Sequence, residues 1–207
     1  MNSLAKRMAG FLADNSTRPV QADELRYGIE IVLGALLQIV LVGIAAAAAD
    51  LFKETMTVLF TVFLYRRYTG GKHCEKYYRC TVSTLFTVLI LGMAAALITV
   101  DYWWLETALV LLLSLYLIDK VAPVDNPALI NDDPEQRRRM KMGATVILLI
   151  LLAFSSVLVL KFQLPSVGSA ILLGLFWQDL TLFRPGMLYI HAWDKLLGSL
   201  ELLWERR

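Results

Sequence analysis

The sequence predicts an all-α protein that forms a polytopic transmembrane helical bundle, and three observations lead to this prediction. Hydrophobic residues make up 57% of the chain and charged residues only 18%, whereas soluble domains average about 45–50% and ~25%. The apolar residues are concentrated in runs that contain almost no charge. Lysine and arginine gather between alternate runs, as they do on the cytoplasmic side of membrane proteins.

Six apolar segments account for the predicted bundle. A helix that crosses the hydrocarbon core of a bilayer needs about 20 residues, and five of the segments come close to that length or exceed it. The second segment is short for a straight crossing at ~1.5 Å per residue. The six segments are 27–49, 51–65, 80–100, 102–118, 143–160 and 166–183. We therefore expect about six spans within residues 27–183, in a single domain that occupies residues 1–207.

The basic residues predict the orientation of these spans. With six crossings and the N-terminus inside, the cytoplasmic segments contain 18 of the 20 lysines and arginines. These segments are 1–26, 66–79, 119–142 and 184–207. Only Lys53 and Lys161 remain for the outer loops, so we expect both termini in the cytoplasm. The net charge of +2 is spread over loops that flank the membrane, which predicts no nucleic-acid partner.

Both ends of the chain have amphipathic patterns. In residues 1–26 apolar side chains recur at helical spacing beside Lys6 and Arg7, which predicts a helix on the membrane surface or an ordinary cytosolic lead-in. Residues 184–207 place Trp193, Leu196 and Leu200 on one helical stripe, which predicts a second interfacial helix or one that packs on the bundle.

Residues 66–80 carry the most reactive chemistry in the sequence. This segment contains the flexible pair Gly70 and Gly71, then His73, and then Cys80 seven residues later. A cysteine nucleophile needs a nearby base to form its thiolate, and the histidine could supply one. On a straight helix the two side chains would share a face but stand ~10 Å apart along the axis, so the chain must bend between them.

Two alternatives exist for these residues. Cys80 could be a small apolar residue that begins a span. A zinc site made by His73, Cys74, Cys80 and His191 fits the usual ligand spacings poorly, so we expect no metal and no cofactor. Both cysteines are predicted to lie at the cytoplasmic interface, where thiols stay reduced.

Two carboxylates fall inside predicted spans near the same end. An ionisable side chain within a membrane is costly and usually faces a partner, which makes Glu30 and Asp179 candidates for function. Either one could orient His73, and Glu30 could instead pair with Arg66. Simple pairing between helices is the alternative for both carboxylates.

The segment from Arg66 to Cys80 resembles the signature of the accessory gene regulator B family. The matching pattern is an arginine, then Gly-Gly-x-His, then a cysteine seven residues after the histidine. Two further stretches are similar to that family: Tyr27-Gly28 at the first span, and residues 122–125, which read Ala-Pro-Val-Asp. The family consists of membrane-embedded cysteine peptidases of bacterial quorum sensing.

This resemblance implies a function and a set of roles. It implies that Cys80 is the nucleophile and His73 its base, with Arg66, Gly70 and Gly71 around the site. The implied substrate is a short precursor peptide with an amphipathic N-terminal helix and an acidic C-terminal part. Cleavage through an acyl-thioester would be followed by cyclisation to a thiolactone or lactone signal. The resemblance also implies a homodimer in the bacterial cell membrane, with its active site at the cytoplasmic face.

A different class of function competes with the peptidase. A small transporter or a membrane assembly partner would use Glu30, Gln38 and Asp179 to line a polar path, and His73 and Cys80 would then be incidental. Internal repeats would favour this alternative, and the sequence contains none at a fixed period.

Overall fold

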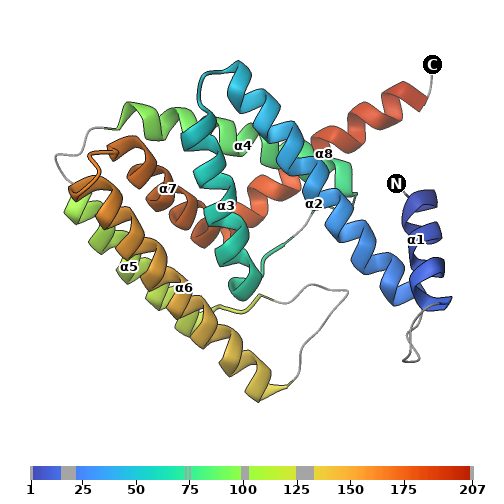
Figure 1. Cartoon of the computed structure of the whole chain (residues 1–207), viewed down its shortest axis with the longest axis horizontal. Helices are drawn as coiled ribbons and strands as arrows, with labels where there is room; N and C mark the ends of the chain where they lie inside the picture. The colour runs from blue at the N-terminus through green and yellow to red at the C-terminus, as the bar shows by residue number, and fades with distance from the viewer. Residues whose placement is uncertain are drawn as a thin grey trace.

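The computed structural model of this chain describes residues 2–14, 22–72, 74, 76–98, 103–124 and 133–205. All of the regular structure within these residues is helical, as predicted, and Figure 1 shows helix α3 among its neighbours in the bundle. The helices are α1 (Asn2–Asp14), α2 (Ala22–Ala48), α3 (Phe52–Thr69), α4 (Tyr77–Leu97), α5 (Trp103–Lys120), α6 (Pro134–Leu160), α7 (Pro165–Thr181) and α8 (Arg184–Glu205).

Fewer than six helices among the described residues have the length and composition of a membrane span. Among the described residues, three helical segments are long and apolar enough to cross: Gly28–Ala48, Tyr77–Leu97 and Pro134–Leu160. Helices α7 and α8 add a fourth if the pair, bent by 84° at its junction, forms one broken span. Helices α3 and α5 contain several charged residues near their ends, and α7 has only 17 residues. Each predicted apolar segment is largely helical, but six crossings are not confirmed.

Three of the four basic segments meet at one end of the bundle. The loop after α3 contacts the segment after α5, where Gly70 and Val124 form an isolated parallel bridge. The first turn of α4 contacts α8 through an ion pair between Arg79 and Asp194. Positive charge is therefore concentrated at this end of the bundle. The side on which that end lies remains a prediction.

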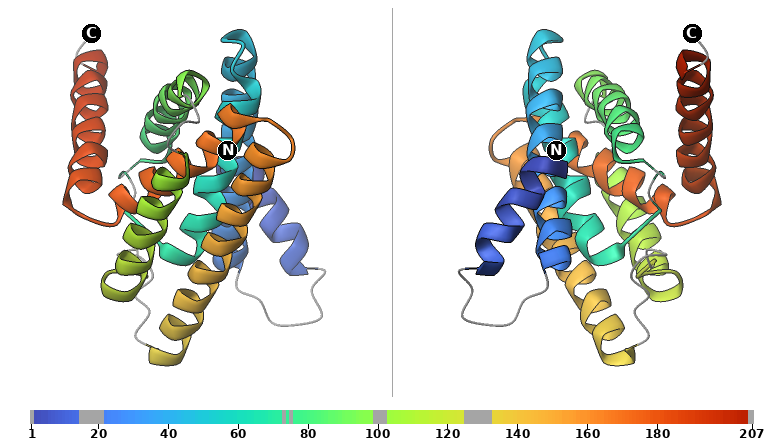
Figure 2. Two further views of the ribbon diagram at one scale, coloured as in Figure 1. Left: turned by 90° about the vertical axis from the view of Figure 1, so that its left-hand side faces the viewer. Right: turned by 90° about the vertical axis from the view of Figure 1, so that its right-hand side faces the viewer.

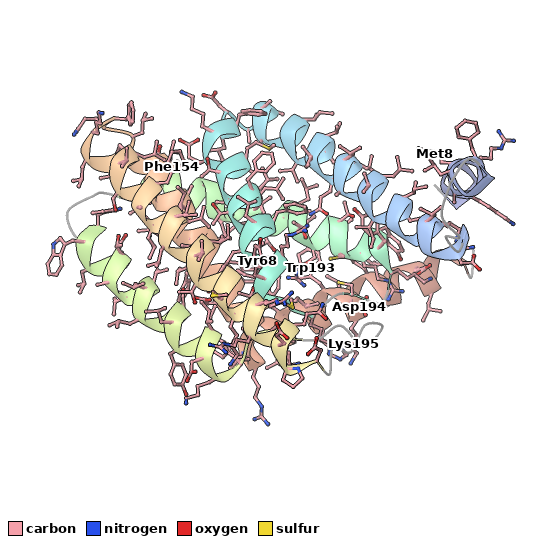
Figure 3. All side chains as sticks on the ribbon, turned by 60° about the horizontal axis from the view of Figure 1, so that its bottom comes forward. Met8, Tyr68, Phe154, Trp193, Asp194 and Lys195 are labelled. Atoms are coloured by element: carbon pink, nitrogen blue, oxygen red, sulfur yellow. The ribbon has the colours of Figure 1, made fainter. Side chains whose placement is uncertain are left out.

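Helices α3 and α7 form the centre of the structure. Helix α7 is buried along most of its length, and its Gly174 allows α3 to approach closely, since a Cβ there would lie 2.9 Å from Thr61. Tyr65 of α3 is fully buried against the core. Tyr68, labelled in Figure 3, packs on α6, where a Cβ on Gly143 would lie 2.4 Å from its ring.

The outer faces of α2 and α6 are apolar and exposed. Such continuous apolar faces suit contact with lipid rather than with water. The exposed side chains include Ile31, Val32, Leu36, Val40 and Ile44 of α2, and Val146, Leu149, Ile150 and Phe154 of α6.

The amphipathic ends of the chain are both helical. Helix α1 packs on α2 and exposes Met8 and Phe11, and α8 runs along one side of the bundle (Figure 2). Trp193 of α8 stacks on Phe86 of α4 with 5.4 Å between ring centroids. Leu196 is exposed. The C-terminal helix therefore packs on the bundle through one face and presents apolar side chains on another.

Candidate active site

The site begins at the diglycine that ends α3. Gly70 and Gly71 have φ angles of 72° and 140°, a region that favours glycine over residues with a side chain. The Gly70 N–H closes the helix by donating to the Arg66 carbonyl at 2.9 Å. A Cβ on Gly70 would lie 2.1 Å from the Val124 carbonyl oxygen, so only glycine fits this turn without a shift.

The diglycine loop is held by the segment that follows α5. The Val124 N–H donates to the Thr69 carbonyl at 2.9 Å, and the Gly71 N–H donates to the Val124 carbonyl at 3.3 Å. Two stretches that the sequence singled out separately, 66–80 and 122–125, are therefore joined through the main chain. Asp125 itself lies outside the described residues.

Gln178 fixes the same loop from beneath, and the sequence reasoning missed it. Its side chain is fully buried, and its Nε2 donates to the Thr69 hydroxyl at 3.0 Å and to the Gly70 carbonyl at 2.9 Å. The available signal was a second polar residue next to Asp179 inside an otherwise apolar run. A buried amide needs partners, so its presence in that run predicts a specific contact.

Arg66 lies between the loop and the two cysteines. Its guanidinium donates to the Lys72 carbonyl and packs over Gly71, where a Cβ would lie 3.2 Å from the guanidinium carbon. The same group is within electrostatic range of Cys74 and Cys80. Arg66 therefore contributes positive charge beside both thiols and braces the loop that leads to them.

The two cysteines are adjacent at the start of α4. Both carry thiols rather than a disulfide, both are half-buried, and their side chains are hydrogen-bonded to each other. Cys80 lies in the first turn of α4, which begins at Tyr77 and contains no acidic residue. The positive end of a helix favours a thiolate at such a position.

The hydrogen bond makes the two thiols unequal. Hydrogen bonding to Cys80, followed by burial, raises the pKa of the Cys74 thiol above its ordinary value. Cys74 therefore stays protonated at neutral pH and can donate its proton to the Cys80 sulfur. This arrangement favours Cys80 as the more nucleophilic of the pair.

The predicted base, His73, lies outside the described residues, so its distance from Cys80 is not defined. Helix α4 begins at Tyr77, and the loop before it turns at Gly70 and Gly71. Cys80 therefore lies on a helix that begins only after position 73, so the ~10 Å separation expected on one straight helix does not apply.

The two candidate carboxylates have different surroundings. Asp179 is fully buried and accepts hydrogen bonds from Tyr65 at 3.2 Å and from Ser114 at 2.5 Å, so it joins α3, α5 and α7. Glu30 is half-buried on α2, one turn before Gly34. A Cβ on Gly34 would lie 2.4 Å from the ring of Tyr77. Glu30 therefore lies one helical turn from the contact between α2 and the start of α4.

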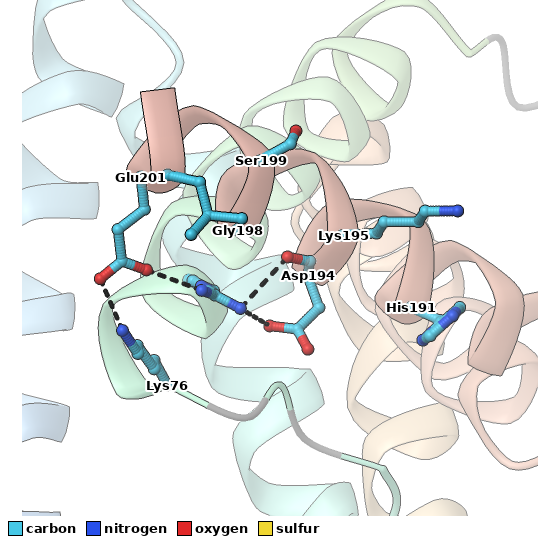
Figure 4. A pocket seen from close by; sticks show the side chains of 9 residues that line it. Lys76, His191, Asp194, Lys195, Gly198, Ser199 and Glu201 are labelled. Carbon is cyan, nitrogen blue, oxygen red and sulfur yellow. Dashed lines mark hydrogen bonds and ion pairs between the residues drawn. The ribbon is translucent and has the colours of Figure 1, made fainter. Parts of the chain in front are cut away.

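Of the four side chains considered for a zinc site, Cys74 and Cys80 are adjacent, and His73 lies outside the described residues. No group of three or more His, Cys, Asp or Glu side chains in the described part of the chain has a geometry that could hold a metal ion. His191 is exposed on α8, in the groove shown in Figure 4.

Fold and site together define an α-helical membrane protein with a pair of thiols beside an arginine at one end of its bundle. The chain matches the model of accessory gene regulator B (AgrB) over residues 5–182, and it belongs to that family. The family acts in the accessory gene regulator system of quorum sensing and is associated with peptide processing.

Curated relatives agree with this assignment. The chain is 24% identical over 187 residues to an AgrB-like protein of Clostridium perfringens, covering 85% of this chain and 87% of the relative. It is 30% identical over 129 residues to an AgrB-like protein of Listeria monocytogenes, covering 62% of each chain. No solved structure matches.

Proposed function

We propose that this protein is a membrane cysteine endopeptidase that cleaves a short precursor peptide near its C-terminal part and promotes cyclisation of the retained fragment. One observation supports the proposal above the others. Cys80 stands in the first turn of α4, at the positive end of the helix, and lies within electrostatic range of the Arg66 guanidinium. A thiol in such surroundings is suited to act as a nucleophile.

The proposed reaction has two acyl-transfer steps. The Cys80 thiolate attacks the scissile carbonyl carbon, and the C–N bond breaks as His73 passes a proton to the leaving amine. The retained fragment is then a thioester of Cys80, and His73 is neutral. A thiol within that fragment gives its proton to His73 and attacks the thioester carbonyl. The bond to Cys80 then breaks, so that a thiolactone forms and Cys80 leaves as the thiolate beside the protonated His73. A hydroxyl in place of the thiol would give a lactone.

The second step requires that water compete poorly with the internal thiol. A recessed site between helices reduces the access of water to the thioester. In this chain the main-chain contacts of Gly70 and Val124, with Gln178 beneath them, close the loop next to the nucleophile. We propose the cytoplasmic face of the bacterial membrane as the place of this site and a homodimer as the working form.

The substrate class is part of the same proposal. The basic segments that meet at one end of the bundle are suited to attract the acidic part of a precursor peptide. An amphipathic helix at the other end of that peptide would lie on the bilayer surface beside the protein.

The test compares membranes that carry wild type, Cys80→Ala, His73→Ala and Cys74→Ala, each given the cognate precursor. We expect wild type and Cys74→Ala to release the C-terminal fragment and the two other variants to lose release, as followed by mass spectrometry. Full processing by Cys80→Ala would reject the mechanism and favour the transporter or assembly partner. In that alternative Asp179 lines a polar path, whereas its carboxylate is bonded to Tyr65 and Ser114 in the core.

A further inference from the structure

Helix α8 lies beyond residues 5–182, the part that matches the family, yet it contacts the first turn of α4 directly. Arg79, the residue before Cys80, is only 8% exposed and is directed at α8. Its Nη1 donates to the Asp194 carboxylate at 3.2 Å and to the Asp194 carbonyl at 3.3 Å. Its Nη2 donates to Glu201 at 2.7 Å. Figure 4 draws these bonds as dashed lines.

Glu201 connects several residues at the start of α4. One of its carboxylate oxygens pairs with Lys76 at 2.5 Å, and the other accepts from Tyr78 at 2.8 Å and from Arg79. Lys76 is the residue that caps α4, and its side chain makes no capping hydrogen bond. The first turn of a helix frays readily because its N–H groups lack partners within the helix. Here Glu201 of α8 binds Lys76, Tyr78 and Arg79, and Asp194 adds a second carboxylate at Arg79, so that α8 holds this turn from outside.

Gly198 of α8 leaves space for the Arg79 side chain. A Cβ on Gly198 would lie 3.1 Å from the Arg79 guanidinium, so a larger residue would push against it. Contacts continue along the same two helices, where the Thr87 and Tyr189 hydroxyls lie 2.7 Å apart. Helices α4 and α8 are therefore in contact from Arg79 to Thr87, and the bonds of Arg79 to Asp194 and Glu201 are part of a continuous interface.

We infer that α8 is a clamp on the start of α4, in which Arg79, held by Asp194 and Glu201, is a positioning residue that sets the location of Cys80. This inference adds a positioning role to the proposed peptidase activity and rests on that proposed function. Arg79 and Cys80 are consecutive, so a shift of the Arg79 backbone moves the sulfur with it. A displacement of about 1 Å in a catalytic geometry lowers rates on the order of 10²-fold. Breaking a buried ion pair on one side also leaves a charge without compensation, which favours such a shift.

The experiment measures Cys80 itself as well as peptidase activity. In a Cys74→Ala background Cys80 is the only cysteine of the chain, because the sequence contains two. Iodoacetamide alkylation in membranes is followed over a range of pH for Arg79→Gln, Arg79→Lys and Glu201→Gln, together with cleavage of the precursor and thermal stability in detergent. Lys195→Gln is the matched control, since it removes a charge from α8 on a side chain that Figure 4 shows away from the cluster.

We expect Glu201→Gln to slow cleavage about tenfold, since bonds to a charged group are lost, and to change the pH at which alkylation is half-maximal. Arg79→Gln should be more severe, Arg79→Lys should recover part of the rate, and Lys195→Gln should match the Cys74→Ala parent. The clamp is rejected if Glu201→Gln and Arg79→Gln alkylate and cleave like the parent, or if they lose only thermal stability. If instead the parent carrying Cys80→Ala still cleaves, the proposed function fails, while the alkylation result continues to test the clamp.

Discussion

Gly70 and Val124 lie side by side as an isolated parallel bridge, although 53 residues lie between them in the sequence, including all of α4 and α5. The contact is so close that a Cβ on Gly70 would lie 2.1 Å from the Val124 carbonyl oxygen. This bridge fixes the loop between α3 and α4, and hence the chain that leads to Cys80. The site therefore depends on main-chain contacts between segments that are remote in sequence.

The first prediction concerns Gly70→Ala. The substitution places a methyl group against Val124 at a φ of 72°, so the loop must move. We expect precursor cleavage to fall on the order of 10²-fold, because the geometry around Cys80 shifts. Gly10→Ala is the control, since nothing lies within 4 Å of a Cβ there. Equal activity of the two variants, measured at equal amounts in the membrane, would contradict this role.

The second prediction concerns Gln178→Leu. This variant removes the two hydrogen bonds to Thr69 and Gly70 and keeps a side chain of similar size. Since the Gly70 carbonyl loses its donor, we expect cleavage to slow by about tenfold. The melting temperature should fall only slightly relative to wild type. Gln136→Leu, at an exposed position on α6, serves as the comparison. Cleavage by Gln178→Leu at the control rate would show that the loop needs no support from α7.

The third prediction separates support of the fold from catalysis at Asp179. In Ser114→Ala the buried carboxylate loses a donor at 2.5 Å, which should lower the free energy of unfolding by about 1–3 kcal/mol. Ser156→Ala is the matched control, because its hydroxyl bonds only within its own helix, to the Leu152 carbonyl. We expect the variant to melt earlier in detergent yet to cleave normally at low temperature. A selective loss of cleavage would instead assign Asp179 to the reaction.

The fourth prediction follows from the pair of thiols. Bonding to Cys80 and burial raise the pKa of Cys74, so this thiol stays protonated at pH 9.0, where an ordinary thiol is half ionised. Stability gained from the protonated thiol is present below pH 9.0 and is lost as the pH rises through the raised pKa. We expect iodoacetamide to modify Cys80 faster than Cys74 in the folded protein and both equally after denaturation. Mass spectrometry of the two cysteine fragments measures this, and faster labelling of Cys74 would contradict it.

The helices could be predicted because long apolar runs leave few alternatives. Spacing alone also selected the diglycine and Cys80, and the family resemblance added Arg66. The structure brings these residues together at one end of the bundle. The number of spans could not be predicted in the same way. Charged residues near the ends of α3 and α5 shorten their apolar stretches, and the 84° bend between α7 and α8 comes from packing that a hydropathy pattern does not give.

The contacts made by polar side chains could not be predicted either. The sequence does not name the partners of Gln178 or Arg79, and only the packing of α7 and α8 provides them. Asp179 was identified as a costly buried charge, but its partners, Tyr65 and Ser114, come from two other helices. Burial can be inferred from an apolar pattern, whereas the direction of a hydrogen bond needs the tertiary structure.

The most direct test of the central claim is to trap the acyl-enzyme. A precursor whose ring-closing cysteine is replaced by alanine cannot resolve the thioester, so the retained fragment should remain on Cys80. Intact-mass spectrometry of the purified wild type should then show the protein plus that fragment, released by hydroxylamine and absent from Cys80→Ala. Cleavage of this precursor without any hydroxylamine-sensitive adduct, together with normal cleavage by Cys80→Ala, would contradict the account.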